Sequence, residues 1–425
     1  MEVNINTVSE VLQEAEIEVS HAELLPHFEE AYKKYQPKVE LKGFRKGKVP
    51  MGMIKKLYGE AIEHESLDTV ASEFYRKAMT DRNIQPLGQP SMVDMDFKRG
   101  EHFRFKIKYE VKPAIVLKKY KGISVEKPVH TVTDEELNGE VEHLRHANST
   151  TEDAAAVTGA EFIVTADVQE LDDAGTPLIG KKTAGAKFTL SDETLVKEIR
   201  DALASAEVGG TCRAKFESQH EDHSHPVHIA LTVTKTEKVY LPAFDDELVK
   251  KITDGKVTSK DEFLKNLRTD IQKYWDEQSE KKVSDALAAE IVKAHDFPVP
   301  DSLVNNFIDA FVEDLKSRSR DRKLPKNFDE KKFREDSKEY ATWQAKWMLL
   351  KERIVEVENL TVADEEIEQL AQKEAAHIGI DAARLLEYYK SSSSAADRLL
   401  TDKVVALLKS QAKIKEKVVD EKSKQ

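Results

Sequence analysis

The chain contains the run Gly43-Phe44-Arg45-Lys46-Gly47-Lys48-Val49-Pro50, which places three cations and one aromatic side chain between two glycines and a proline. Glycine frees the backbone at both ends of such a loop, and proline interrupts a continuing helix or strand. Burying the cations would be costly, so we expect them and the phenylalanine to be presented at the surface. The run therefore predicts a contact loop, and its cations favour an anionic partner.

Basic residues are concentrated around this run. Residues 31–58 contain nine basic side chains and a single acid, Glu40, whereas the whole chain has a net charge of −13. An acidic molecule repels phosphate, which argues against a general nucleic-acid binder. One basic face would instead orient the molecule toward a particular anionic partner. The charges alone would also be typical of a solvated loop, but the phenylalanine and the paired glycines favour docking.

The length and composition indicate several domains in a reducing compartment. A chain of 425 residues is too long for one compact core, so about two to four domains are expected. Charged residues make up 34% of the chain, which is typical of an elongated, mostly helical protein with much surface. Cys212 is the only cysteine, so no intramolecular disulfide can form. The first residues carry no signal-peptide pattern and no apolar run reaches membrane-spanning length, so we expect a soluble, cytoplasmic protein without a membrane partner.

The amino-terminal 112 residues are predicted to form an α+β domain. Apolar and charged residues alternate over residues 103–111, which is the pattern of a half-buried strand. A turn precedes it, so residues 92–97 are its expected hairpin partner. Helices are expected over 22–36 and 60–83, and the glycine-bracketed run would then lie on the connection between them.

The rest of the chain divides into three further segments. Residues 113–150 are expected to be a linker followed by an arm helix, because Thr133 and Glu136 have the spacing of a capping box. Residues 151–240 are rich in β-prone residues with one helix candidate near 195–203, which predicts a β-rich domain. Residues 241–425 are expected to be helical, with helices over about 259–295, from Asp301, around Trp343 and Trp347, and over 399–414. The predicted fold class is multidomain α+β, mostly helical.

The run 43–50 resembles the ribosome-binding signature of trigger factor, a family of bacterial chaperones that meet nascent chains at the tunnel exit. All eight positions agree with that pattern, and the likeness extends over the whole chain, with Pro298-Val299-Pro300 before a helix as a lesser feature. The resemblance implies contacts with the large ribosomal subunit, both protein and rRNA at the tunnel exit. The residues that would make or shape these contacts are Gly43, Phe44, Arg45, Lys46, Gly47 and Lys48.

The resemblance also implies roles for the other segments. Residues 151–240 would be an inserted FKBP-like domain, and residues 241–425 a helical body with arms that holds nascent and unfolded polypeptides without ATP. Core packing is the ordinary role of an apolar helical stripe, but part of this surface would line a cradle for clients. The cradle candidates are Phe307, Phe311, Leu315, Trp343 and Trp347. A second copy of the chain is a further candidate partner, since surfaces that hold clients can also hold a homodimer together.

FKBP-like prolyl isomerases lower a barrier of ~20 kcal/mol with an aromatic pocket and use no acid, base or metal. Residues 151–239 contain just three aromatic residues, and the candidate pocket is Phe162, Phe188, Ile199 and Phe216. The family's Ile-Pro-Gly-Phe-Glu turn aligns with residues 196–200, where proline, glycine and the aromatic residue are missing. We therefore expect weak or absent isomerase activity; the alternative is an active peptidyl-prolyl isomerase that works as a folding catalyst.

Other chemistry is weakly indicated. A histidine-rich segment matches no standard zinc spacing, so no metal site is expected at His220, Asp222, His223, His225 and His228. The sequence has no glycine-rich phosphate loop, no Cys-His nucleophile pair and no carboxylate pair that stands out. No catalytic residue and no cofactor are therefore expected. An RNA-binding protein that uses residues 31–58 would lack the interleaved aromatic residues of a stacking platform.

Overall fold

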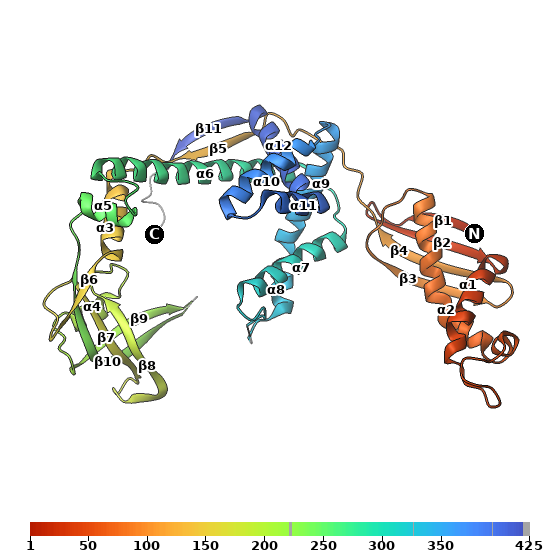
Figure 1. The fold of residues 1–425 in the computed structure, drawn as a ribbon, viewed down its shortest axis with the longest axis horizontal. Helices are drawn as coiled ribbons and strands as arrows, with labels where there is room; N and C mark the ends of the chain where they lie inside the picture. The colour runs from red at the N-terminus through yellow and green to blue at the C-terminus, as the bar shows by residue number, and fades with distance from the viewer. Residues whose placement is uncertain (221–222, 326, 393, 420–425) are drawn as a thin grey trace. The chain divides into compact units, whose positions relative to one another are not determined.

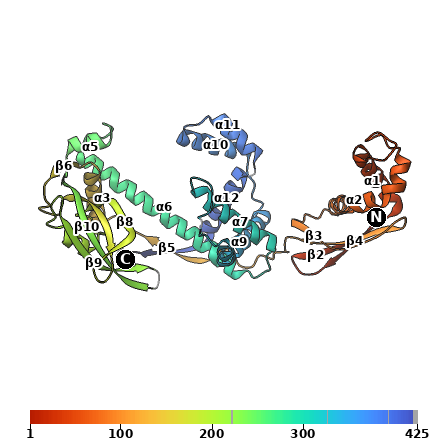
Figure 2. The ribbon, with the colours of Figure 1, turned by 90° about the horizontal axis from the view of Figure 1, so that it is seen from below.

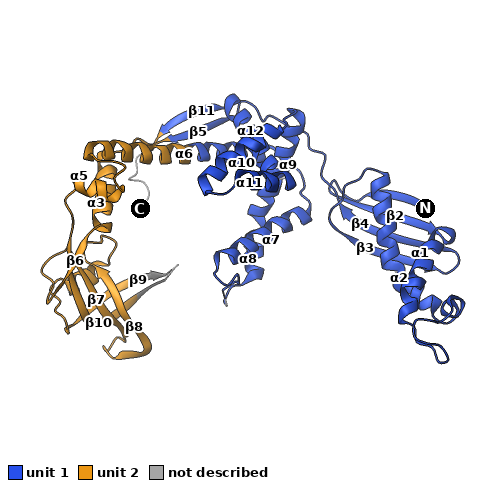
Figure 3. Ribbon diagram, in the orientation of Figure 1, with its two compact units in different colours: residues 1–128, 280–417 blue, residues 129–279, 418–425 orange. Residues whose placement is uncertain are grey.

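The computed structural model describes residues 1–220, 223–325, 327–392 and 394–419. The chain divides into two compact units, one of residues 1–128 with 280–417 and one of residues 129–279 with the chain end from 418 (Figure 3). The predicted multidomain α+β class is confirmed: an α+β domain comes first, a β-rich domain lies in the middle of the chain, and a helical body follows.

The amino-terminal domain is an antiparallel sheet with two helices on one of its sides (Figures 1 and 2). The sheet has the order β1-β2-β4-β3, with β1 (Glu2–Thr7), β2 (Leu12–Ser20), β3 (Leu87–Lys98) and β4 (His102–Glu110). Because side chains alternate between the faces of a strand, every second residue of β2 and β4 enters the core beneath the helices. These buried residues are Ala15, Ile17, Val19, Phe103, Phe105, Ile107 and Tyr109. The predicted hairpin is confirmed.

Helices α1 (His21–Tyr35) and α2 (Met51–Asp81) frame the glycine-bracketed run. The expected start of the second helix at residue 60 is wrong, because α2 begins directly after Pro50, an extended residue at the helix start. Proline is compatible with a helix beginning, where its missing N–H costs no hydrogen bond. The first turns of α2 expose Leu57 and Tyr58, so they carry no clear apolar stripe.

The middle domain is a five-stranded antiparallel sheet with one short helix, α4 (Lys197–Leu203). Four of its strands lie in the order β6-β10-β7-β8, and the fifth strand, β9, pairs with β10. The strands are β6 (Thr150–Ala154), β7 (Phe162–Leu171), β8 (Pro177–Thr189), β9 (Thr211–His220) and β10 (His223–Tyr240). The predicted arm helix is α3 (Asp134–Ala147), where the hydroxyl of Thr133 accepts from the Glu136 amide and the Glu136 carboxylate accepts from the Thr133 amide. The capping box is confirmed.

The carboxy-terminal body is built from amphipathic helices. After α5 (Asp246–Ile252) these are α6 (Lys260–Ala294), α7 (Asp301–Arg318), α8 (Glu330–Asp336), α9 (Lys338–Val357), α10 (Asp364–Ile378), α11 (Ala382–Ser391) and α12 (Ser394–Gln411). The last helix begins before residue 399 and ends before residue 414, in contrast to the expectation. It ends early because β11 (Lys413–Val418) pairs with β5 (Ser124–Val129). None of the described helices has the length and apolar character that crossing a bilayer requires.

Candidate functional site

The connection between α1 and α2 projects beyond the helix pair (Figure 1). It begins with a short 3-10 turn, η1 (Gln36–Lys38), and two buried valines, Val39 and Val49, anchor its base. The Gln36 Nε2 donates to the Val49 carbonyl at 2.9 Å, and the Gly47 amide donates to the Val39 carbonyl at 3.3 Å. The two ends of the loop are therefore tied together, and residues 40–48 form its tip.

Both glycines of the loop adopt the left-handed backbone conformation. The φ of Gly43 is 95° and that of Gly47 is 75°, a region that L-residues with a Cβ rarely enter. A Cβ on Gly47 would also lie 3.2 Å from the Cα of Pro37, whereas a Cβ on Gly43 would meet nothing within 4 Å. The second glycine is therefore required both by its φ and by a close neighbour.

The tip presents its aromatic ring and its cations to solvent. Phe44 is 39% exposed, and Arg45, Lys46 and Lys48 are exposed as well. Lys46 Nζ lies 2.6 Å from Glu40 Oε1, and this pair lowers the pKa of the Glu40 carboxyl. Among the described residues, Arg45 and Lys48 form no ion pair. Lys42 is exposed as well and, among the residues that the structure describes, forms no ion pair. The loop thus offers three unpaired cations, one cation paired with Glu40 and an apolar ring to a partner.

A buried carboxylate links the two helices that flank the loop to the β3–β4 turn. Glu63 of α2 is 6% exposed and accepts from the hydroxyl of Tyr32 on α1. It also accepts from Arg99 of the β3–β4 turn, at 2.8 Å from Nε and 3.0 Å from Nη2. Burial and the nearby carboxylate raise the pKa of Tyr32 to about 12. A Cβ on Gly59 would lie 2.9 Å from Arg99 Nη2, so glycine one turn earlier makes room for this contact.

Sequence reasoning did not identify Glu63. Its signal was an acid among the apolar residues of α2, one turn after a glycine. The carboxylate joins both helices to the sheet, so it positions the helix pair from which the loop of residues 40–48 projects.

The four isomerase candidates lie in one hydrophobic cluster. Phe162 and Ile199 are buried in the core of the middle domain. Phe188 and Phe216 are half-buried and pack against the same core from β8 and β9. Since Phe162 and Ile199 are 3% and 7% exposed, their side chains fill the domain interior and have little surface to offer a substrate.

The turn that precedes α4 is closed by Arg200. Its Nη2 donates to the carbonyl of Asp192 at 2.6 Å and to that of Leu195 at 3.2 Å. Arg200 is the last residue of the segment 196–200, and its contacts fix the backbone of residues 192–195 that leads into α4. A guanidinium that binds main-chain carbonyls gives structural support, but it supplies no apolar wall for an imide.

The cradle candidates lie on α7 and α9. Phe311 stacks on Tyr340 with ring centroids 5.6 Å apart, and Tyr340 stacks on Trp343 at 6.0 Å with an interplanar angle of 5°. Tyr340 is 57% exposed and was not identified from the sequence, although it precedes Trp343 by three residues on the same helix. Phe307 packs against the α7–α9 core, and Leu315 is half-buried one helical turn after Phe311.

Helices α6, α9 and α12 line a groove of about 1030 Å³. Trp343, Trp347 and Tyr340 contribute its aromatic side chains, and Ala288 and Val405 contribute small apolar surface. The structure thus brings the two predicted tryptophans together in one groove. Phe307, Phe311 and Leu315 do not line it. Aromatic rings on a polar frame suit varied apolar ligands, because they bind by contact area and not by a fixed hydrogen-bond pattern.

The histidine-rich segment lies mostly outside the described part of the chain. Residues 221 and 222 are not described, nor are the side chains of 218–225, which include three of the histidines and Asp222. Across the described residues, no group of three or more His, Cys, Asp or Glu side chains is placed to hold a metal ion. Cys212 is a half-buried thiol that packs against the middle-domain core.

Comparison with known proteins identifies relatives over nearly the full length. A model of the bacterial trigger factor protein (TF) matches residues 1–144, and a model of its C-terminus matches residues 259–410. The chain is 28% identical to the trigger factor of Salinibacter ruber, with 96% of this chain and 93% of that protein covered. It is 30% identical to the trigger factor of Chloroherpeton thalassium, with 97% of each covered. A solved trigger factor chaperone structure superposes with a TM-score of 0.52 at 20% identity, covering 96% of this chain and 99% of the other.

Proposed function

The chain belongs to the trigger factor family, and we propose that it is an ATP-independent cytoplasmic chaperone that docks on the large ribosomal subunit near the tunnel exit and shields nascent chains. The observation that carries this proposal is the loop of residues 43–48, which is tied at its base and exposes Phe44, Arg45 and Lys48. Exposed cations next to an exposed aromatic ring are suited to rRNA phosphate and to acidic or apolar protein surface.

Docking would begin from a loop that needs little rearrangement. Arg45 and Lys48 are free to pair with phosphate, and Lys46 would exchange Glu40 for an anion of the ribosome. An exposed ion pair of this kind contributes only about 0–1 kcal/mol, so breaking it requires little free energy. Phe44 is 39% exposed, so burial of its remaining surface would add about 1 kcal/mol from apolar area.

We also propose a role for each segment of the chain. We infer that residues 1–112 dock, that residues 113–150 form a linker and arm, and that residues 241–425 hold unfolded segments. The stack of Phe311, Tyr340 and Trp343 and the neighbouring groove support the last assignment. Residues 151–240 would keep an FKBP-like fold with weak or absent isomerase activity, which the buried Phe162 and Ile199 favour.

Co-sedimentation with 70S ribosomes at two salt concentrations tests the docking. The variant Phe44→Ala/Arg45→Ala/Lys46→Ala is expected to lose binding, and binding of the unaltered chain is expected to weaken with salt. Arg320→Ala/Lys323→Ala is the matched control, because it also removes two exposed cations from a loop. Equal pelleting of the triple variant and the unaltered chain would contradict docking through this loop.

A proline-peptide assay tests the isomerase assignment. We expect turnover far below that of an ordinary FKBP. Turnover comparable to an FKBP, and sensitive to Phe188→Ala or Phe216→Ala, would instead establish the alternative of an active folding catalyst.

A further inference from the structure

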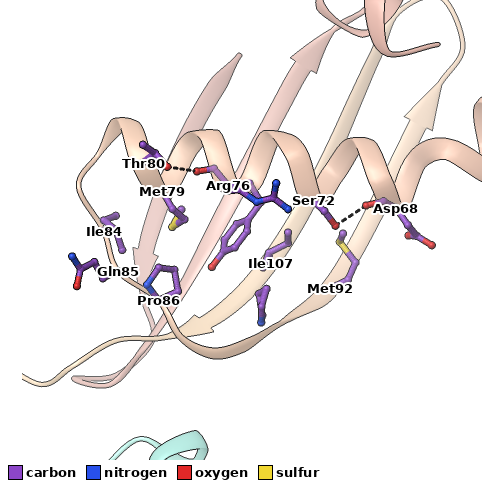
Figure 4. Close-up of a pocket in the computed structure, with 12 residues that line it drawn as sticks. Asp68, Ser72, Arg76, Met79, Thr80, Ile84, Gln85, Pro86, Met92 and Ile107 are labelled. Carbon is purple, nitrogen blue, oxygen red and sulfur yellow. Dashed lines mark hydrogen bonds between the residues drawn. The ribbon is translucent and has the colours of Figure 1, made fainter. Parts of the chain in front are cut away.

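A groove of about 650 Å³ lies in the amino-terminal domain, between the second half of α2 and strands β3 and β4 (Figure 4). Its apolar lining includes Tyr75, Met79, Ile84, Pro86, Met92 and Ile107. No residue of the basic segment 31–58 lines it. The groove is therefore separate from the docking loop, and the ribosome contact proposed above does not use it.

The groove is open because β3 pairs irregularly with β4. Leu87 opposes Glu110 and Ser91 opposes Lys108, so three residues of β3 lie opposite the single residue Tyr109. This bulge carries the start of β3 away from a regular ladder. Residues 88–94 are exposed, and β3 is an edge strand of the sheet. An edge strand offers main-chain donors and acceptors to another extended segment.

One polar group in the lining has no partner. Tyr75 is 8% exposed, and its hydroxyl forms no hydrogen bond within the described part of the chain. Burial raises the pKa of Tyr75, so the hydroxyl keeps its proton and can donate. A buried donor without an acceptor is unfavourable, and a ligand that brings an acceptor would relieve this cost. Every peptide unit carries a carbonyl oxygen, whereas a hydrocarbon carries none.

The charge of the groove lining and the irregular course of the edge strand β3 argue against two other partners, a phosphate-bearing ligand and a second copy of the chain. Asp68 and Arg76 are the acid and the base of the lining, so it has no surplus positive charge with which to attract phosphate. Pro90 lacks an N–H, and the bulge interrupts the ladder, so a long strand of a second copy could not pair continuously. A short segment needs only a few main-chain contacts.

We propose that this groove binds a short, extended, uncharged apolar segment of a client polypeptide. An apolar side chain of the segment would occupy the space between Met79 and Met92, and one of its carbonyls would accept from Tyr75. The docking domain would then hold a client site of its own, separate from the groove around Trp343 and Trp347. The proposal deepens the chaperone function proposed above and rests on it.

Methyl NMR of the full chain with ¹³C-methyl methionine tests the proposal at residue resolution. The probe is an acetylated and amidated eight-residue peptide of valine, isoleucine, glutamine and serine. Met79 and Met92 report this groove, and Met348, which packs in the α7–α9 cluster with Phe311, reports the helical body. Saturable shifts of the Met79 and Met92 signals are the expected result.

Matched variants then distinguish peptide binding in the groove from peptide binding along the exposed edge of β3. Met92→Glu places a charge at the groove and is expected to abolish the Met79 shift. Val93→Glu is the control, because Val93 is the neighbouring residue of β3, is 48% exposed and does not line the groove. It is expected to bind the peptide normally. Tyr75→Phe is expected to weaken binding about five-fold, the effect of one hydrogen bond, while the melting temperature stays the same or rises.

Three outcomes would overturn the proposal. The first is a shift of Met348 without shifts of Met79 and Met92, which would leave the chaperone function standing and remove only this site. The second is equal weakening by Met92→Glu and Val93→Glu, because binding would then follow charge on the strand edge. The third is no shift at any methionine. Ribosome co-sedimentation is independent of all three, so failure here and failure of the docking function are distinguishable.

Discussion

Gly43 and Gly47 share a positive φ, but their surroundings differ. An L-residue in the left-handed region costs about 1–2 kcal/mol, and a Cβ on Gly47 would also crowd Pro37 at 3.2 Å. The two positions therefore separate backbone strain from steric contact within one loop.

Gly47→Ala is expected to weaken ribosome binding by about tenfold, which corresponds to about 1.4 kcal/mol. Gly43→Ala is expected to have a smaller effect, since its Cβ meets no neighbour. Titration of ribosomes in the co-sedimentation assay measures both. Equal losses would mean that the contact with Pro37 does not constrain the loop.

Glu63 is the buried residue that links α1 and α2, the helices flanking the loop, to the β3–β4 turn. Glu63→Ala removes the acceptor for Tyr32 and Arg99 and is expected to destabilise the domain by about 2–3 kcal/mol. Urea unfolding followed by circular dichroism measures this change. Glu60→Ala is the control, because Glu60 is exposed on the same helix. A loss below about 0.5 kcal/mol for Glu63→Ala would show that the network is dispensable.

Among the secondary-structure elements, α6 is tied to two others through one carboxylate. Glu280 Oε1 lies 2.6 Å from Lys127 of β5, and Glu280 Oε2 lies 2.7 Å from Lys409 of α12. Hydrogen bonds from these two lysines lower the pKa of Glu280 from 4.5 to about 2. A carboxyl with a lower pKa in the folded state stabilises the fold when it is ionised.

The stabilisation by Glu280 is therefore fully present above pH 4.5 and is lost as the pH falls toward 2. Glu280→Gln is expected to lower the melting temperature at pH 7, and the difference from the unaltered chain is expected to vanish near pH 2. Melting curves recorded over this pH range test the sign. A difference that grows on acidification would contradict the assignment.

The elements that sequence predicted best are those with local signals. The capping box at Thr133 and the proline-rich stop before Asp301 each act within a few residues, so α3 and α7 begin where expected. The start of α2 was missed because its first turns are exposed and lack an apolar period. The strand β11 was missed because it exists only through pairing with β5, some 290 residues earlier in the chain.

For the molecule as a whole, the proposed docking and client-holding activities are assigned to different residues, so we expect variants to separate them. Tyr340→Ser removes the exposed ring between Phe311 and Trp343 and is expected to reduce suppression of client aggregation several-fold while ribosome binding is unchanged. Tyr274→Ser is the control, since Tyr274 is 56% exposed on α6. The triple variant of the docking loop is expected to behave in the opposite way. Light scattering of a denatured client and co-sedimentation measure the two activities, and joint loss in either variant would contradict the separation.

The family, the exposed glycine-bracketed loop and the sparse aromatic content of the middle domain could all be inferred from residues close together in the chain. Glycine conformation, exposed charge and the absence of aromatic residues do not depend on distant partners, so Phe44 and Arg45 were identified before any fold was known. The surroundings of Tyr340, Glu63 and Tyr75 could not be inferred in this way. A ring stack, a buried carboxylate with three donors and a groove beside a strand bulge arise only when helices and strands from separate segments pack together. Local composition specifies which side chains are available, and packing determines which of them share a surface.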